Sequence, residues 1–273
     1  MKTNECLKTF EGHSRTVNCV KYLNENQIVS CSYDRSIKIW DKTTGDCIRT
    51  LSGHLNTVWC IAVLSNERIA SCSSDRTIRV WEVESGRVIQ ILNGHTDVVN
   101  RIAKLSDVRL LSCSEDSTIK LWNVDSAECL RTLSGHLKGV LFVDIFGKTK
   151  DLHFLVMSGS KDTKIKIWNI NTGLCLQTLE GHTNAVECIQ ILSGNKIISG
   201  SWDLTIRIWC LNTNSCIQTI NAHLDAVYEI KLLADNKLAS SSQDGTIKIW
   251  DLDSAECIKT FNMKSVSLSI DAF

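Results

Sequence analysis

The sequence contains no proline, and its 14 glycines among 273 residues are a modest number. Disordered linkers are usually rich in one or both residues, so we expect no such linker in the chain. There is no excess charge of either sign either, because 30 basic residues balance 30 acidic ones. Proteins that bind nucleic acid or an anionic membrane usually carry a basic surface, so the balance argues against both partners.

Long apolar runs and CxxC pairs are also missing. The N-terminus, MKTNECLKTFEGH, has no apolar stretch, and no segment approaches the length of a membrane span. The sequence therefore predicts a soluble cytoplasmic protein, with the nucleus as an alternative location. No residues suggest a bound metal or cofactor.

The 13 cysteines mostly occupy equivalent positions of a repeated segment. One set is Cys6, Cys47, Cys129, Cys175, Cys216 and Cys257; a second is Cys19, Cys60 and Cys188; a third is Cys31, Cys72 and Cys113. Equivalent positions of successive repeats should lie far apart, which argues against disulfides and metal sites. We expect these cysteines to be small buried apolar residues in a reducing compartment.

The repeated segment carries four residue types in register, with Gly-His near one end and Trp at the other. The six sets are His13, Ser30, Asp34, Trp40; His54, Ser71, Asp75, Trp81; His95, Ser112, Asp116, Trp122; His136, Ser158, Asp162, Trp168; His182, Ser199, Asp203, Trp209; and His223, Ser240, Asp244, Trp250. The tryptophans are 41 residues apart, except that 46 residues separate Trp122 from Trp168. A repeat of this length and pattern is typical of a β-propeller blade.

Each repeat predicts four short strands separated by polar turns, and nothing in the chain predicts a helix. We therefore expect an all-β propeller of four-stranded blades, forming one domain over residues 1–273. Its complete repeats lie near 13–51, 54–92, 95–133, 136–179, 182–220 and 223–261. Lone strands near 5–10 and 265–273 predict an incomplete seventh blade. A six-bladed ring and a truncated chain are the alternatives.

The repeated His, Ser and Asp residues could suggest a hydrolase. A hydrolase needs one nucleophile held against one base beside an oxyanion site, and six equivalent sets offer no advantage for that chemistry. A structural role explains the tryptophan as well, because a chain from Trp through Ser and His to Asp satisfies every donor and acceptor. We therefore predict no catalytic residues and reject the hydrolase hypothesis.

With these motifs in place, the chain resembles the WD-repeat family of β-propellers over nearly its whole length. The Trp-Asp pair that names the family is present at Trp40-Asp41 and Trp250-Asp251. The resemblance implies a ring of usually seven blades, in which the four-residue set braces each blade. It also implies two positions per repeat on the top face, around the central channel, that often contact partners.

Carried over to this sequence, the first of these positions is Asn18, Trp59, Asn100, Leu141, Glu187 and Tyr228. The second is Tyr33, Ser74, Glu115, Lys161, Trp202 and Gln243. Trp59 and Trp202 are the two tryptophans outside the repeated sets, and Tyr33 and Tyr228 also occupy these positions. Because Trp and Tyr often dominate binding energy at interfaces, we predict partner binding at these twelve residues.

The predicted function is a non-catalytic scaffold or adaptor that binds other proteins or peptides within a complex. A reader of phosphorylated or methyl-lysine peptides is the alternative. Similar F-box substrate receptors of ubiquitin ligases read phosphopeptides with arginines at these positions, whereas here only Lys161 is basic. The incomplete seventh blade should leave strand edges open to self-association or to pairing with another chain.

Overall fold

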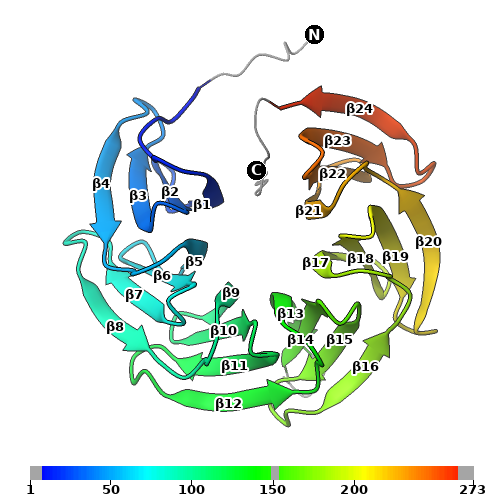
Figure 1. Ribbon diagram of the computed structural model, residues 1–273, viewed down its shortest axis with the longest axis horizontal. Coiled ribbons are helices and arrows are strands. Elements are labelled where there is room, and N and C mark those ends of the chain that lie inside the picture. Colours follow the sequence, from blue (N-terminus) through cyan, green and yellow to red (C-terminus); the bar gives the residue numbers. More distant parts are fainter. Residues whose placement is uncertain (1–7, 149–153, 264–273) are drawn as a thin grey trace.

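The computed structural model describes residues 8–148 and 154–263. Within these residues the chain forms six antiparallel four-stranded sheets and no helix, arranged as the blades of a ring (Figure 1). The sheets are called blades 1 to 6 in chain order. In every blade the first strand lies nearest the centre of the ring and the fourth lies outermost.

The strands of the first three blades are β1 Val17–Tyr22, β2 Gln27–Ser32, β3 Ser36–Asp41, β4 Cys47–Ser52, β5 Val58–Val63, β6 Arg68–Ser73, β7 Ile78–Glu82, β8 Val88–Leu92, β9 Val99–Ser106, β10 Arg109–Ser114, β11 Thr118–Asn123 and β12 Cys129–Ser134. Those of the last three are β13 Val140–Lys148, β14 Phe154–Ser160, β15 Ile165–Asn169, β16 Cys175–Leu179, β17 Val186–Leu192, β18 Lys196–Ser201, β19 Thr205–Cys210, β20 Ser215–Asn221, β21 Val227–Leu232, β22 Lys237–Ser242, β23 Thr246–Asp251 and β24 Cys257–Asn262.

Burial within a blade follows strand position. The second strands are buried over nearly their whole length, whereas the third strands alternate between buried aliphatic and half-buried basic residues, as in Ile37, Lys38 and Ile39. The outer strands expose most of their side chains. These patterns are those expected for a sheet packed on both faces at its centre and reaching solvent at its outer edge.

Neighbouring blades pack face to face through their inner strands. Val186 at the start of β17 lies against Gly159 of blade 4, and Val227 of β21 lies against Gly200 of blade 5. A Cβ atom at Gly159 would stand 2.8 Å from the Val186 carbonyl oxygen, so glycine permits this approach. The core therefore runs around the ring, from blade to blade.

Among the described residues, no strand lies between blade 1 and blade 6 (Figure 1). Ile247, Ile249 and Phe261 of blade 6 are half-buried there. Their equivalents in blade 1, Ile37, Ile39 and Leu51, are buried, and so are those of blades 2 to 5. The difference arises because each of those five faces packs against a following blade.

The strands predicted for a seventh blade lie mostly outside the described residues. Residues 265–273 and 5–7 are not described, and Lys8 to Phe10 form no strand. Lys8 nevertheless lies beside Gly45 of blade 1, just as Arg49 lies beside Gly86 and Arg131 beside Gly173. The ring of Phe10 packs edge-on to Trp40, with centroids 5.9 Å apart.

Two expectations about cysteine were wrong. Cys47, Cys129, Cys175 and Cys257 are exposed rather than buried, because they begin the outermost strands; Cys216 is intermediate, and Cys6 lies outside the described residues. The inner cysteines also do not lie far apart. Cys19 faces Cys31 across β1 and β2, and Cys60 faces Cys72 in blade 2. Because the blades converge at the centre, Cys19 and Cys60 contact each other between blades. All the described cysteines are free thiols.

Candidate functional site

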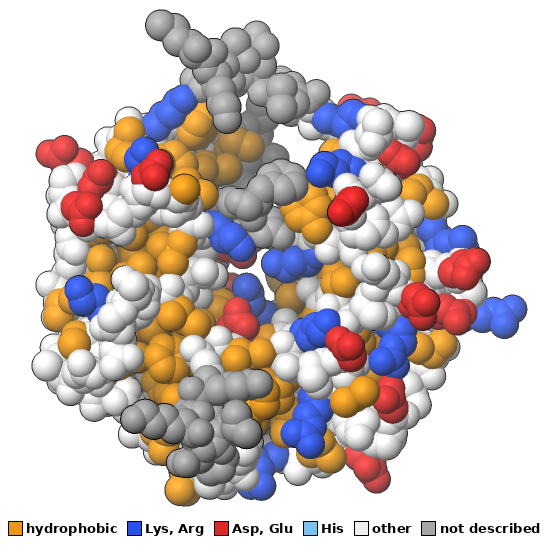
Figure 2. Space-filling view, turned by 180° about the vertical axis from the view of Figure 1, so that it is seen from behind, with side chains coloured by type: hydrophobic (Ala, Val, Ile, Leu, Met, Phe, Trp, Pro, Cys, Tyr) orange, Lys and Arg blue, Asp and Glu red, His pale blue; other side chains and the backbone are white. Residues whose placement is uncertain are grey.

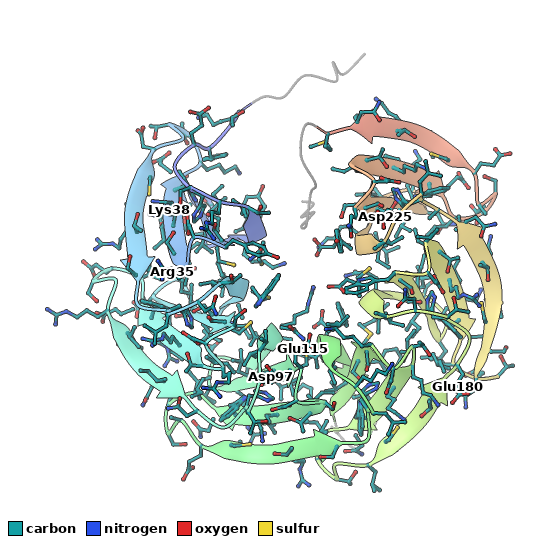
Figure 3. The ribbon with its side chains drawn as sticks, viewed as in Figure 1. Arg35, Lys38, Asp97, Glu115, Glu180 and Asp225 are labelled. Atoms are coloured by element: carbon teal, nitrogen blue, oxygen red, sulfur yellow. The ribbon has the colours of Figure 1, made fainter. Side chains whose placement is uncertain are left out.

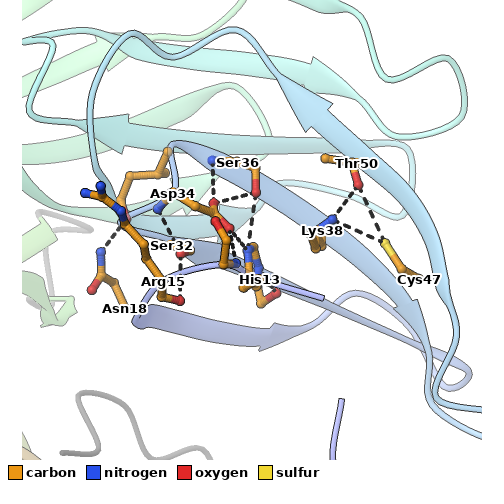
Figure 4. Close-up of polar contacts among 12 residues, drawn as sticks. His13, Arg15, Asn18, Ser32, Asp34, Ser36, Lys38, Cys47 and Thr50 are labelled. Carbon is orange, nitrogen blue, oxygen red and sulfur yellow. Dashed lines mark hydrogen bonds and ion pairs between the residues drawn. The ribbon is translucent and has the colours of Figure 1, made fainter. Parts of the chain in front are cut away.

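The four repeated residues form one hydrogen-bonded chain in each blade. In blade 3 the Trp122 Nε1 donates to Ser112 Oγ at 2.8 Å, His95 Nε2 lies 2.7 Å from that Oγ, and His95 Nδ1 lies 2.7 Å from Asp116 Oδ2. The other five blades repeat these contacts within 2.7–3.0 Å, and Figure 4 shows His13 and Asp34 of blade 1. The predicted brace is confirmed.

Chemistry fixes the direction of this chain. A carboxylate only accepts, so His Nδ1 donates to it, and Nε2 then accepts the Ser hydroxyl proton. Asp34 also accepts from the backbone of Ser14 and Ser36. Burial alone would raise its pKa, but the donors Ser36 and His13 outweigh burial and hold the pKa at about 2. The Asp34 carboxyl group is therefore ionised near neutral pH.

Sequence reasoning missed two further members of this network. A hydroxyl two residues after the Asp donates to its Oδ1 in five blades, as Thr118 does to Asp116 at 2.6 Å, whereas blade 4 has Lys164 at that position. A second serine, two residues after the first, accepts from the Asp backbone; Ser114 of blade 3 is an example. The recurring Ser-x-Ser and Asp-x-Ser/Thr spacings in the sequence could have revealed both.

These sets have no accessible nucleophile. Ser112 is fully buried, and its Oγ is occupied by Trp122 and His95. No group of three or more His, Cys, Asp or Glu residues suited to a metal ion occurs among the described residues. The residues available for binding therefore lie elsewhere, at the inner ends of the blades.

A cavity of about 390 Å³ occupies the centre of the ring. Ten of the twelve predicted partner-binding residues line it: Asn18, Tyr33, Trp59, Asn100, Glu115, Leu141, Lys161, Glu187, Trp202 and Tyr228. Ser74 and Gln243 do not line the cavity but contact residues that do. Ser74 accepts from Trp59 Nε1 at 2.7 Å, and Gln243 accepts from the Tyr228 hydroxyl. Figure 3 shows Glu115 facing the centre, in contrast to Glu180 at the outside.

The four aromatic residues form two groups. Tyr33 of blade 1 packs edge-on to Trp59 of blade 2, with ring centroids 5.1 Å apart. Trp202 of blade 5 donates from Nε1 to Glu187 Oε2 at 2.9 Å, and Tyr228 belongs to blade 6. The two groups therefore lie in the blades on either side of the boundary between blades 1 and 6 (Figure 1).

Polar contacts link the remaining residues from blade to blade. Asn100 donates to Glu115 Oε1 at 3.1 Å and to the Val140 carbonyl oxygen at 2.9 Å, and Lys161 forms an ion pair of 2.8 Å with Glu115. Asn18 donates to the Val58 carbonyl oxygen at 2.7 Å. These contacts hold the cavity wall in place.

Glu187 is a carboxyl group at the cavity whose pKa departs from its ordinary value. Burial raises its pKa to about 7, against the hydrogen bond from Trp202 and the attraction of Arg101 and Lys161. Since the folded state favours the protonated form, this group stabilises the fold at low pH. That contribution is lost as the pH rises from the ordinary glutamate value of about 4.5 through 7.

We expect Glu187→Gln to melt at a higher temperature than the wild-type protein at pH 8 and at nearly the same temperature at pH 5. Glutamine keeps an acceptor for Trp202 and removes the charge. Melting curves measured from pH 5 to pH 8 check this, and a difference that does not grow with pH would contradict it.

Three leucines that the sequence analysis did not single out extend the same end of the blades. Leu55, Leu137 and Leu224 each follow the His of a repeat and are 76%, 82% and 88% exposed. Their backbone N–H groups donate to Asp75, Asp162 and Asp244, which places them beside the turns that hold Ser74, Lys161 and Gln243. The sequence signal was a leucine directly after His in alternate repeats.

Figure 2 shows the ring from behind, where Lys and Arg side chains, with some Asp and Glu side chains among them, surround the central opening, and hydrophobic side chains lie over the blades. None of the described elements is a helix long and apolar enough to cross a membrane.

Comparisons with known proteins agree with this architecture. The family model described as "WD domain, G-beta repeat" matches residues 4–41, 45–82 and 214–251, and a β-propeller model described as WDR41 matches residues 87–219. A stretch of 42 residues is 43% identical to pre-mRNA-processing factor 17 of Saccharomyces cerevisiae; it covers 15% of this chain and 9% of that protein's length. Together with six braced four-stranded blades, the family matches show that this chain belongs to the WD-repeat family of β-propellers.

Proposed function

We propose that the chain is a non-catalytic scaffold or adaptor that binds a protein or peptide at the cavity mouth and the surrounding blade turns. The observation that carries this proposal is the aromatic group Tyr33, Trp59, Trp202 and Tyr228. None of the four belongs to a brace, yet all line one cavity. Aromatic side chains in partly buried positions are the residues that most often dominate binding energy.

The family supports the proposal that the chain binds other proteins, since WD-repeat propellers generally do so. The match to pre-mRNA-processing factor 17 spans about one repeat, so it supports the repeat and not a role in splicing. The proposal that the chain is not a catalyst is supported by the buried serines of the six repeated sets, because their hydroxyl groups are occupied by hydrogen bonds. The free thiols fit the proposed cytoplasmic location.

Phosphopeptide reading fits the cavity less well. Of the twelve proposed residues only Lys161 is basic, and it already pairs with Glu115. The arginine that also lines the cavity, Arg101, lies with its guanidinium 4.4 Å from the centre of the Phe142 ring. Phosphate is usually gripped by arginines that donate two hydrogen bonds. A substrate receptor that reads phosphopeptides in a ubiquitin ligase is disfavoured for the same reason.

Affinity capture from cell extract tests the proposed function. We expect a Trp59→Ala/Trp202→Ala double variant to lose the proteins that the wild-type chain captures. Tyr22→Ala is the matched control, because Tyr22 is an aromatic residue with the same 36% exposure as Trp202 but lies at the far end of its inner strand. Equal capture by the double variant and the wild type would contradict the proposal.

The exposed leucines should contribute to the same interface. We expect Leu137→Ser to weaken binding of a captured partner about tenfold, since burial of a leucine contributes roughly 1.5 kcal/mol or more. The melting temperature should not change, because the side chain is 82% exposed. A titration of the partner checks the affinity; an unchanged affinity would place Leu137 outside the interface.

We further propose that residues 5–7 and 265–273 contribute to an incomplete seventh blade, whose free edges can pair with another chain or a second copy. The half-buried Ile247, Ile249 and Phe261 support this, as does the place of Lys8 beside Gly45. Such a blade would cover the open face of blade 6 and leave unpaired strand edges.

Deleting residues 264–273 should lower the melting temperature and speed amide exchange in β21 to β24, because the apolar face of blade 6 would lose its cover. Exchange measured by mass spectrometry checks this, with β9 to β12 as the internal reference. Exchange rates unchanged by the deletion would contradict the proposed blade. Sedimentation at increasing concentration measures self-association, and a strictly monomeric chain would exclude pairing between copies.

A further inference from the structure

The cavity contains a buried acceptor without a donor. Asn18 is 7% exposed and lines the cavity; its Nδ2 donates to Val58, while its Oδ1 has no hydrogen-bond partner among the described residues. A buried carbonyl oxygen without a donor is unfavourable by about 1–3 kcal/mol. A ligand that brings a donor to the cavity would remove this penalty.

A second acceptor is charged. Glu187 Oε2 accepts from Trp202 Nε1. Within residues 8–148 and 154–263, no cationic nitrogen lies within 4.0 Å of the Glu187 carboxylate oxygens, the distance that defines an ion pair. Three cations line the cavity, Lys21, Arg101 and Lys161. Lys161 pairs with Glu115, and the Arg101 guanidinium lies 4.4 Å from the centre of the Phe142 ring. Among the residues that the structure describes, Glu187 is therefore a half-buried carboxyl group without an ion-pair partner.

Glu187 also lies near the aromatic groups on both sides of the boundary between blades 1 and 6. Burial, followed by the nearby Glu187 carboxylate, raises the pKa of both Tyr33 and Tyr228. The Tyr33–Trp59 pair belongs to blades 1 and 2, whereas Glu187 and Tyr228 belong to blades 5 and 6. Aromatic rings attract cations through their faces, and this attraction adds to that of a carboxylate.

We propose that the cavity binds the cationic side chain of a partner segment, a lysine or an arginine. Its charged end pairs with Glu187, and its carbon chain lies between the two aromatic groups. The inference deepens the proposed function, because it names the chemistry recognised at the same surface. A carboxylate or phosphate side chain placed beside Glu187 would face a like charge in a half-buried site, so the inference expects no anion to bind at that position.

Small-molecule probes test the inference without an identified partner. The probes are Nα-acetyl-N-methylamides of lysine, arginine and trimethyl-lysine, with norleucine as the uncharged control of similar shape. NMR signals of the Trp59 and Trp202 indole N–H groups, assigned with Trp→Phe variants, report binding. We expect at least one cationic probe to bind tenfold or more tightly than norleucine at pH 8. Comparing the three cationic probes shows whether the cavity prefers a lysine, an arginine or a trimethyl-lysine side chain.

Glu187→Gln should abolish the preference for cations and leave norleucine binding unchanged. Glu67→Gln is the control, because Glu67 is an exposed carboxylate in the turn between β5 and β6. For the wild type, cation binding should strengthen from pH 5.5 to pH 8 as Glu187 ionises among Arg101, Lys161, Glu115 and the two tyrosines. Norleucine binding as tight as lysine, a Glu187→Gln variant that keeps the preference, or no shift with any probe would overturn the inference.

The two proposals fail separately. If captured partners depend on Trp59 and Trp202 but not on Glu187, and the probes show no preference for cations, the surface binds proteins by other chemistry. If the probes depend on Glu187 while capture is indifferent to the tryptophans, the cation site exists but is not the main interface.

Discussion

Replacing Asp116 by alanine should lower the free energy of unfolding by about 3 kcal/mol. This carboxylate accepts from His95 Nδ1 at 2.7 Å, from the Thr96 and Thr118 backbone at 3.0 Å, and from the Thr118 hydroxyl at 2.6 Å. Alanine leaves these donors without an acceptor, and each buried unpaired group is unfavourable by about 1–3 kcal/mol. Water that enters the turn would satisfy some of these donors. The expected loss of stability is therefore smaller than the sum over all the unpaired donors.

Denaturant unfolding at pH 7 measures the effect, and Asp125→Ala is its control. Asp125 belongs to the same blade, but it forms an exposed ion pair with Arg68, and such pairs contribute about 1 kcal/mol or less. Trp168→Phe should cost about 1–3 kcal/mol, because it removes the donor to Ser158. If Asp116→Ala unfolds at the wild-type midpoint, the brace does not stabilise the blade.

Replacing Trp59 by alanine should weaken partner binding by about 2 kcal/mol, or roughly thirtyfold, as expected for a dominant aromatic contact. The residue lines the cavity, packs against Tyr33 and is anchored by its bond to Ser74. It also packs against the core of blades 1 to 3, so some loss of thermal stability should accompany the change.

Two further variants separate binding from folding. Trp202→Ala removes a more exposed ring and should weaken binding with less effect on melting. Tyr22→Ala should leave affinity unchanged. A titration of any captured partner gives the affinities, and melting curves give the fraction folded. If Tyr22→Ala weakens binding and Trp59→Ala does not, the interface lies on the other face of the ring.

Much of the fold could be predicted because repetition multiplies weak signals. One His, Ser, Asp and Trp set could be chance, whereas six in register predict six braced blades, and each set forms its hydrogen-bonded chain. The resemblance to the WD-repeat family implies the two positions around the cavity, and the register only carries them from repeat to repeat. What these residues bind stays a prediction, because a repeat pattern describes what the blades share and a ligand is recognised by what differs among them.

The errors have a geometric origin. Linear spacing suggested that Cys19 and Cys60 lie far apart, but blades converge toward the centre, so inner positions of neighbouring repeats meet. Linear spacing also could not show that Cys47 starts an outermost strand and reaches solvent. The perturbed pKa of Glu187 was likewise hidden, since it arises from burial among residues of several blades.

The boundary between blades 1 and 6 decides how the molecule should unfold. In a closed ring every blade has two neighbours, and no blade can detach without breaking two interfaces. Without the seventh blade proposed above, the six described blades are thermodynamically a linear array, in which the end units have one neighbour each and fray first. Blade 6, with Ile247 and Ile249 half-buried, is such an end unit. A ligand that spans blades 1, 2, 5 and 6 across the central cavity would therefore couple the two ends of the array and raise the cooperativity of the whole domain.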